Sequence, residues 1–200
     1  DLGLTGTEEI YFASMHADID GGIEVTASHN PADYNGLKFV GRKGIPLTDE
    51  EYAELRRIAS GPQAPASGSK GKARATSFLT EYVDHLLAQV DLAALPPMRI
   101  LADVGNGAAG HVLAEIERRF SAAKVPAGFR IVNARPDGRF PNGVPNPLLP
   151  ERRARTIAAV REQGADIGIA WDGDFDRCFF FDADGRYVSG VIARADGGRS

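Results

Sequence analysis

The chain has 200 residues, a formal net charge of −4 and no run of basic residues, which argues against nonspecific nucleic-acid binding. The sequence shows neither an apolar run long enough to cross a membrane nor a signal peptide, so we expect a cytoplasmic protein without membrane contact. Its single cysteine, Cys178, excludes an internal disulfide framework, and the apolar neighbours of this residue predict a buried core thiol.

The first part of the chain predicts two strands between two helices. Alternating β-branched residues indicate the first strand, and an Asn-Gly turn signal leads into the second. Thr48 and Glu51 have the spacing of a capping box, which opens the second helix. In chain order we expect a helix at 5–15, strands at 22–27 and 37–40, and a helix from the capping box to about 59.

Residues 60–75 are rich in Ser, Gly and Pro and lack hydrophobic periodicity, so we expect an exposed linker. A domain boundary at its end divides the chain into residues 1–75 and 76–200. Beyond the linker, helical and strand patterns alternate, which predicts a largely parallel sheet with helices on its faces. The expected elements are helices at 76–90, 108–120 and 151–163, and strands at 99–104, 129–132, 167–170 and 178–181.

Three carboxylates, Asp172, Asp174 and Asp176, follow an apolar strand on alternate residues. Open α/β sheets place their ligands at the carboxyl ends of strands, and carboxylates held close together repel one another unless a cation neutralises them. Hard oxygen ligands select Mg²⁺, Ca²⁺ or Mn²⁺. An EF-hand does not fit, because its sixth and twelfth positions would be Arg177 and Ala183. A solvated acidic turn remains the alternative.

Gly105, Gly107 and Gly110 satisfy the G-x-G-x-x-G pattern between a predicted strand and a predicted helix. A dinucleotide site would also need an acid at the tip of the second strand, near Asn133, and none is present there. A tight turn that requires small residues explains the glycines better, and the helix N-terminus would add positive potential toward an anion. We therefore assign no residue to a nucleotide cofactor.

Ser28 lies just past a predicted strand, where a serine is commonly only a turn residue. Two neighbours favour chemistry: His29 could bind an anion or move a proton, and Lys38 on the next strand could return beside the loop. Together with a separate Mg²⁺-type loop these groups suit phosphoryl transfer, which depends on positioning and charge neutralisation. A serine hydrolase is less well supported, because no G-x-S-x-G motif surrounds Ser28.

Three motifs in this order resemble those of the α-D-phosphohexomutases. Thr-Ala-Ser-His-Asn-Pro at 26–31, with Asp-Tyr-Asn-Gly-Leu-Lys at 33–38, resembles the family's phosphoserine loop. The segment 103–110 resembles the opening of the second domain, and 172–177 resembles the metal loop. Phe175, with its flanking residues, is similar to the bacterial phosphomannomutases of the family. The resemblance implies an α/β fold of two layered α/β/α domains with mixed, largely parallel sheets.

The resemblance also implies a metal centre. Ser28 would carry the transferable phosphate, and an oxygen of that phosphoserine would share one Mg²⁺ ion with Asp172, Asp174 and Asp176. The expected metal ligands are therefore these three carboxylates and Ser28.

By the same resemblance, Lys38 is a general acid/base, and His29 and Arg177 lie near the transferring phosphoryl group. The implied reaction passes phosphate from Ser28 to a sugar phosphate, forms a bisphosphorylated sugar that turns around, and returns the other phosphate. This interconverts hexose 6-phosphate and hexose 1-phosphate, with mannose as the expected sugar. The partner is thus a small sugar phosphate.

The chain departs from the four-domain family pattern. By comparison with the family, we expect the stretch 1–200 to lack the opening strand with its arginine and domains III and IV, and the segment 189–200 does not match the pattern. We therefore expect residues 1–75 to be an N-terminally incomplete domain I, residues 76–200 to be domain II, and the chain alone to be inactive. Phosphoglucomutase, phosphoglucosamine mutase and a non-catalytic nucleotide- or phosphate-binding module stay open as alternatives, as does the oligomeric state.

Overall fold

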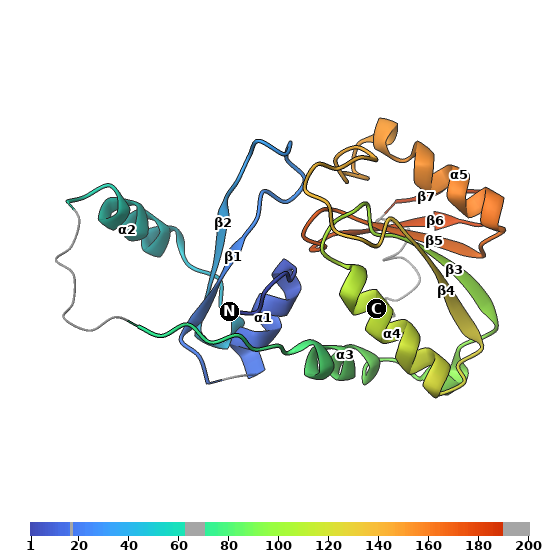
Figure 1. Cartoon of the computed structure of the whole chain (residues 1–200), viewed down its shortest axis with the longest axis horizontal. Helices are drawn as coiled ribbons and strands as arrows, with labels where there is room; N and C mark the ends of the chain where they lie inside the picture. The colour runs from blue at the N-terminus through green and yellow to red at the C-terminus, as the bar shows by residue number, and fades with distance from the viewer. Residues whose placement is uncertain (17, 63–70, 190–200) are drawn as a thin grey trace, which may run out of the picture.

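The computed structural model describes residues 1–16, 18–62 and 71–189, so the central part of the predicted linker and all but the first residue of the unmatched segment 189–200 lie outside the described residues. Two units follow one another along the chain (Figure 1). The first unit contains α1 (Thr7–His16), β1 (Gly21–Val25), β2 (Leu37–Gly41), the 3₁₀ turn η1 (Arg42–Gly44) and α2 (Asp49–Ala59).

The two strands of the first unit form an antiparallel hairpin. Val25 pairs with Leu37, so residues 26–36 form a loop at that end of the hairpin, and Glu24 pairs with Lys38. This register confirms that Lys38 returns beside the serine loop. The predicted capping box is also confirmed, because Thr48 Oγ1 accepts the N–H of Glu51 at 3.2 Å while the Glu51 side chain accepts the N–H of Thr48 at 2.7 Å.

The second unit is built on a five-stranded sheet in the order β4-β3-β5-β6-β7. The strand β3 pairs in parallel with β4 and β5, whereas β5–β6 and β6–β7 pair antiparallel. The short acidic loop between β5 and β6 cannot form the crossover that a parallel pair needs, so the sheet is mixed. Its elements are α3 (Leu79–Leu87), η2 (Leu92–Ala94), β3 (Met98–Asp103), α4 (Gly110–Ala122), β4 (Ala127–Val132), η3 (Pro150–Arg152), α5 (Ala154–Gln163), β5 (Ile167–Trp171), β6 (Cys178–Asp182) and β7 (Tyr187–Val188).

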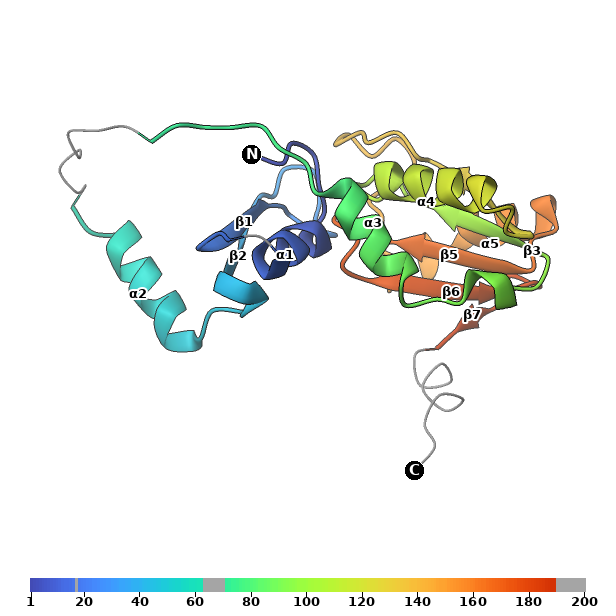
Figure 2. The same ribbon diagram turned by 90° about the horizontal axis from the view of Figure 1, so that it is seen from below.

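Helices cover both faces of this sheet, as the α/β prediction requires. In Figure 1 the sheet lies between α4 and α5, and in Figure 2 α3 lies alongside α4. Tyr82 of α3 packs in one buried cluster with Val104, and Val160 of α5 packs in another with Leu101. Phe12 of α1 joins the first of these clusters, with its ring centroid 5.4 Å from that of Tyr82. The two units therefore share a core.

The expectation of a buried Cys178 thiol is wrong, since this residue is exposed. Strand alternation explains the difference: Phe179 and Phe181 of β6 face the core, so Cys178 points the other way. Along 1–16, 18–62 and 71–189, no helix is both long and apolar enough to cross a membrane.

Candidate active site

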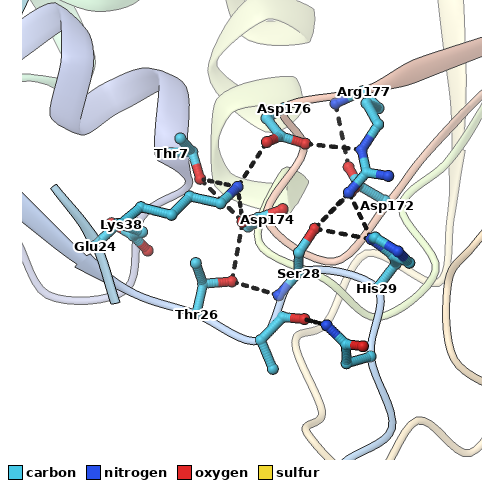
Figure 3. A network of polar contacts seen from close by, with 12 residues as sticks. Thr7, Glu24, Thr26, Ser28, His29, Lys38, Asp172, Asp174, Asp176 and Arg177 are labelled. Carbon is cyan, nitrogen blue, oxygen red and sulfur yellow. Dashed lines mark hydrogen bonds and ion pairs between the residues drawn. The ribbon is translucent and has the colours of Figure 1, made fainter. Parts of the chain in front are cut away.

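Side chains from both units converge where the loop after β1 meets the loop between β5 and β6 (Figure 3). The first unit contributes the serine loop and one residue of β2, and the second contributes the acidic loop. All of the predicted site residues come together here: Ser28, His29, Lys38, Asp172, Asp174, Asp176 and Arg177.

The three aspartates form a compact acidic cluster, in which one oxygen of each lies within 4.8 Å of the others. Asp172 and Asp174 are only 1% and 3% exposed. Burial, and then the charge of Asp176, raises the pKa of Asp172 above its usual value. Because deprotonated carboxylates at this spacing repel one another, a nearby positive charge would stabilise the ionised cluster.

The two carboxylate oxygens of Asp174 have different surroundings. Its Oδ2 atom accepts three hydrogen bonds, whereas its buried Oδ1 has no hydrogen-bond partner among the residues that the structure describes. A buried acceptor without a partner is costly. A set of carboxylate oxygens with one acceptor left open fits a hard divalent ion such as Mg²⁺.

Lys38 supplies positive charge to the cluster from β2. Its Nζ lies 2.7 Å from Asp174 Oδ2, 2.6 Å from Asp176 Oδ2 and 3.1 Å from Thr7 Oγ1. Burial lowers the pKa of Lys38, but the hydrogen bonds and charges of the two aspartates outweigh burial and raise it above the usual value. Lys38 is therefore held as an ammonium group, which can neutralise the acids and donate a proton.

Ser28 lies between the acidic loop and two basic groups. Its Oγ lies 3.0 Å from Asp172 Oδ2, 2.7 Å from Arg177 Nη2 and 3.2 Å from His29 Nδ1. A guanidinium can only donate, so the serine oxygen accepts from Arg177. His29 Nδ1 also contacts Arg177 Nη2 and must accept there, which places the proton of a neutral imidazole on Nε2.

The backbone of both loops is held in an uncommon conformation. Ser28 has a φ of 52° and Phe175 a φ of 47°, both in the left-handed region that glycine adopts more readily. Such a position costs a non-glycine residue about 1–2 kcal/mol. Phe175 is buried, with its ring against Gly6, where a β-carbon would have no room. The ring therefore anchors the acidic loop on the start of α1.

The loop that contains Gly105 and Gly107 also supports the acidic loop. The N–H of Ala108 donates to Gly173 O at 2.9 Å, and a β-carbon on Gly107 would lie 2.6 Å from the same oxygen. A β-carbon on Gly110 would lie even closer to the backbone oxygen of Ala134. Close packing thus accounts for the two later glycines of the pattern, in agreement with the tight-turn interpretation.

Two family models match the chain. Residues 1–64 match "Phosphoglucomutase/phosphomannomutase, alpha/beta/alpha domain I" and residues 80–185 match the corresponding domain II. The chain belongs to the phosphoglucomutase/phosphomannomutase family. Membership confirms the resemblance of the three motifs and the mixed α/β fold.

Individual relatives agree with this family assignment. A phosphomannomutase of Escherichia coli is 53% identical over 204 residues, covering 98% of this chain and 45% of the relative. One from Vibrio cholerae is 50% identical, covering 95% and 41%. A crystal structure of a phosphoglucomutase/phosphomannomutase family protein from Burkholderia thailandensis matches with a TM-score of 0.78 and 30% identity, covering 98% of this chain and 44% of that one. The chain thus spans about half the length of the relatives it matches.

Three residues of this candidate site were not singled out from the sequence. Thr7 and Thr26 donate hydrogen bonds to Asp174 Oδ2 at 2.9 and 3.0 Å, and Glu24 lies beside Lys38 with only 8% exposure. Burial, with added repulsion from nearby acids, raises the pKa of Glu24 to about 7. The position of Thr26 two residues before Ser28 was an available signal, whereas nothing in the sequence links Thr7 to Asp174.

Proposed function

We propose that the protein carrying this chain interconverts mannose 6-phosphate and mannose 1-phosphate through a phosphoserine at Ser28. The observation that carries the proposal is the convergence on Ser28 Oγ of Arg177, His29 and the acidic loop. Relatives named phosphomannomutase, at 53% and 50% identity, support mannose as the sugar.

In the proposed transfer, the P–O bond to Ser28 Oγ breaks as a bond forms between phosphorus and a sugar hydroxyl oxygen. The hydroxyl loses its proton and Ser28 Oγ gains one, so charge and atoms balance. The second half-reaction reverses these changes with the other phosphate of the bisphosphorylated sugar. Arg177 donates to the serine oxygen, where it can also hold phosphoryl oxygens, and Lys38, whose ammonium group is hydrogen-bonded to Asp174, can exchange a proton.

We infer that Asp172, Asp174 and Asp176 hold one Mg²⁺ ion together with a phosphoserine oxygen on Ser28. When bound, this ion would withdraw charge from the phosphoryl oxygens during transfer. The open Oδ1 of Asp174 and the mutual closeness of the three carboxylates support this donor set.

We further propose that residues 1–75 form domain I and residues 76–200 domain II of a larger enzyme. The two loops that would carry phosphate and metal come from different domains under this division. The reaction therefore needs both domains in contact, and the shared core around Phe12 and Tyr82 would maintain that contact.

Covalent phosphate on Ser28 is the direct test. The protein expressed from its complete gene should lose the mass of one phosphate on phosphatase treatment, and Ser28→Ala should lack this phosphate. Ser121→Ala, which removes an exposed hydroxyl on α4, serves as the matched control. Turnover of mannose 1-phosphate at the wild-type rate by Ser28→Ala would show that the proposal is wrong.

A further inference from the structure

Thr26 connects the serine loop to the acidic loop through one hydroxyl group. Its Oγ1 accepts the N–H of Ser28 at 2.8 Å and donates to Asp174 Oδ2 at 3.0 Å (Figure 3). Thr26 and Asp174 lie 148 residues apart in the sequence. A hydroxyl that accepts and donates at once fixes its own orientation and strengthens both bonds.

The first of these bonds acts on the backbone of Ser28. A threonine hydroxyl that accepts the N–H two residues later forms a local turn that competes with regular structure. Here the turn coincides with the left-handed φ of 52° at Ser28, a conformation that persists only when surrounding contacts impose it. The hydroxyl of Thr26 therefore helps to hold the serine where Arg177 Nη2 reaches its Oγ at 2.7 Å.

The second bond acts on the orientation of Asp174. Thr26, Thr7 and Lys38 all donate to Oδ2 of this carboxylate, at 3.0, 2.9 and 2.7 Å. Donors gathered on one oxygen stop the carboxylate from rotating and leave its buried Oδ1 open to a cation. Groups that orient a metal ligand in this way typically change metal affinity by about 10- to 100-fold when they are removed.

We propose that Thr26 is a positioning residue that holds Ser28 and Asp174 in fixed register across the two loops. It would not touch the substrate. Its hydroxyl would fix the distance between the atom that carries phosphate and the carboxylate that faces the cation. The benefit of this positioning to catalysis rests on the proposed function, but the effects of Thr26 on the Ser28 backbone and on Asp174 can be measured without any substrate.

Three variants made in the complete gene separate these effects. Thr26→Val removes the hydroxyl at nearly constant volume, Thr26→Ser retains it, and Thr7→Val removes one donor to Asp174 without touching Ser28. Two measurements need no turnover: hydrogen exchange of the Ser28 amide in the metal-free, phosphatase-treated protein, and Mg²⁺ affinity by calorimetry. Steady-state kinetics with mannose 1-phosphate then separate kcat from KM.

We expect Thr26→Val to speed exchange of the Ser28 amide about 10-fold or more, to weaken Mg²⁺ binding at least 10-fold, and to lower kcat with little change in KM. Thr26→Ser should stay near the wild type in Ser28 amide exchange, Mg²⁺ affinity and kcat. Thr7→Val should weaken Mg²⁺ binding and leave the Ser28 amide unchanged.

Wild-type amide exchange and Mg²⁺ affinity in Thr26→Val would overturn the proposal, as would equal losses in Thr26→Ser, which would point to packing instead of the hydroxyl. If both substrate-free effects appear but the wild-type protein turns over no hexose phosphate, the positioning role stands and the proposed function fails.

Discussion

Replacing Glu24 with Gln should make the protein more stable at alkaline pH. Glu24 is 8% exposed, and of the residues in the described part of the chain, Thr5 alone donates a hydrogen bond to its carboxylate, at 3.3 Å. Burial is the largest cause that raises its pKa from 4.5 to about 7, with Asp174 and Glu9 adding to it. Ionised Glu24 is therefore poorly solvated in the folded state.

The sign and size of the expected change in unfolding free energy follow from proton linkage. Between pH 4.5 and about 7 the folded protein holds a proton on Glu24 that the unfolded chain releases, so stability falls as the pH rises through this window. One pKa unit corresponds to about 1.4 kcal/mol, so the full loss is about 3 kcal/mol. A glutamine, which stays neutral, should avoid this loss.

Urea unfolding followed by circular dichroism, at pH 5 and pH 9 with a chelator present, measures the effect. We expect Glu24→Gln to differ little from the wild type at pH 5 and to gain about 2–3 kcal/mol relative to it at pH 9. Glu81→Gln, which changes an exposed carboxylate on α3, is the matched control and should show no such trend. A difference between Glu24→Gln and wild type that does not depend on pH would refute the reasoning.

Three further predictions concern the metal site and the contact between the units. Asp174→Asn should weaken Mg²⁺ binding by calorimetry while the far-UV circular dichroism stays that of the wild type; unchanged affinity would count against the metal assignment. Gly6→Ala, whose β-carbon would meet the Phe175 ring and lie 2.7 Å from Asp174 O, should cost about 1–3 kcal/mol of unfolding free energy, and a neutral effect in urea titrations would contradict this packing. Burial lowers the pKa of His111, but the hydrogen bond and charge of Glu9 outweigh this effect, so the pKa is raised above 6.5. The His111–Glu9 pair therefore stabilises the folded state fully below pH 6.5, and this stabilisation is lost as the pH rises through the raised pKa. His111→Gln should therefore lower the melting temperature more at pH 6 than at pH 9, and equal shifts at both values would argue against an ion pair.

The local features of the chain could be predicted from the sequence, because their causes lie within a few residues. The capping box at Thr48 and the return of Lys38 beside the serine loop follow from short-range patterns. The acidic loop could be placed at the end of a strand because the apolar run before Asp172 is itself a local signal. The candidate site was recognisable because its motifs occupy three short loops.

Tertiary structure alone decided how those loops meet. The hydrogen bond from Thr7 to Asp174 spans 167 residues, and no local pattern predicts it. The charge of Asp174 that adds to the raised pKa of Glu24 comes from the other unit, and the exposure of Cys178 depends on which face of β6 meets the core. These properties arise from contacts between distant segments, and such contacts exist only after both units have packed around Phe12 and Phe175.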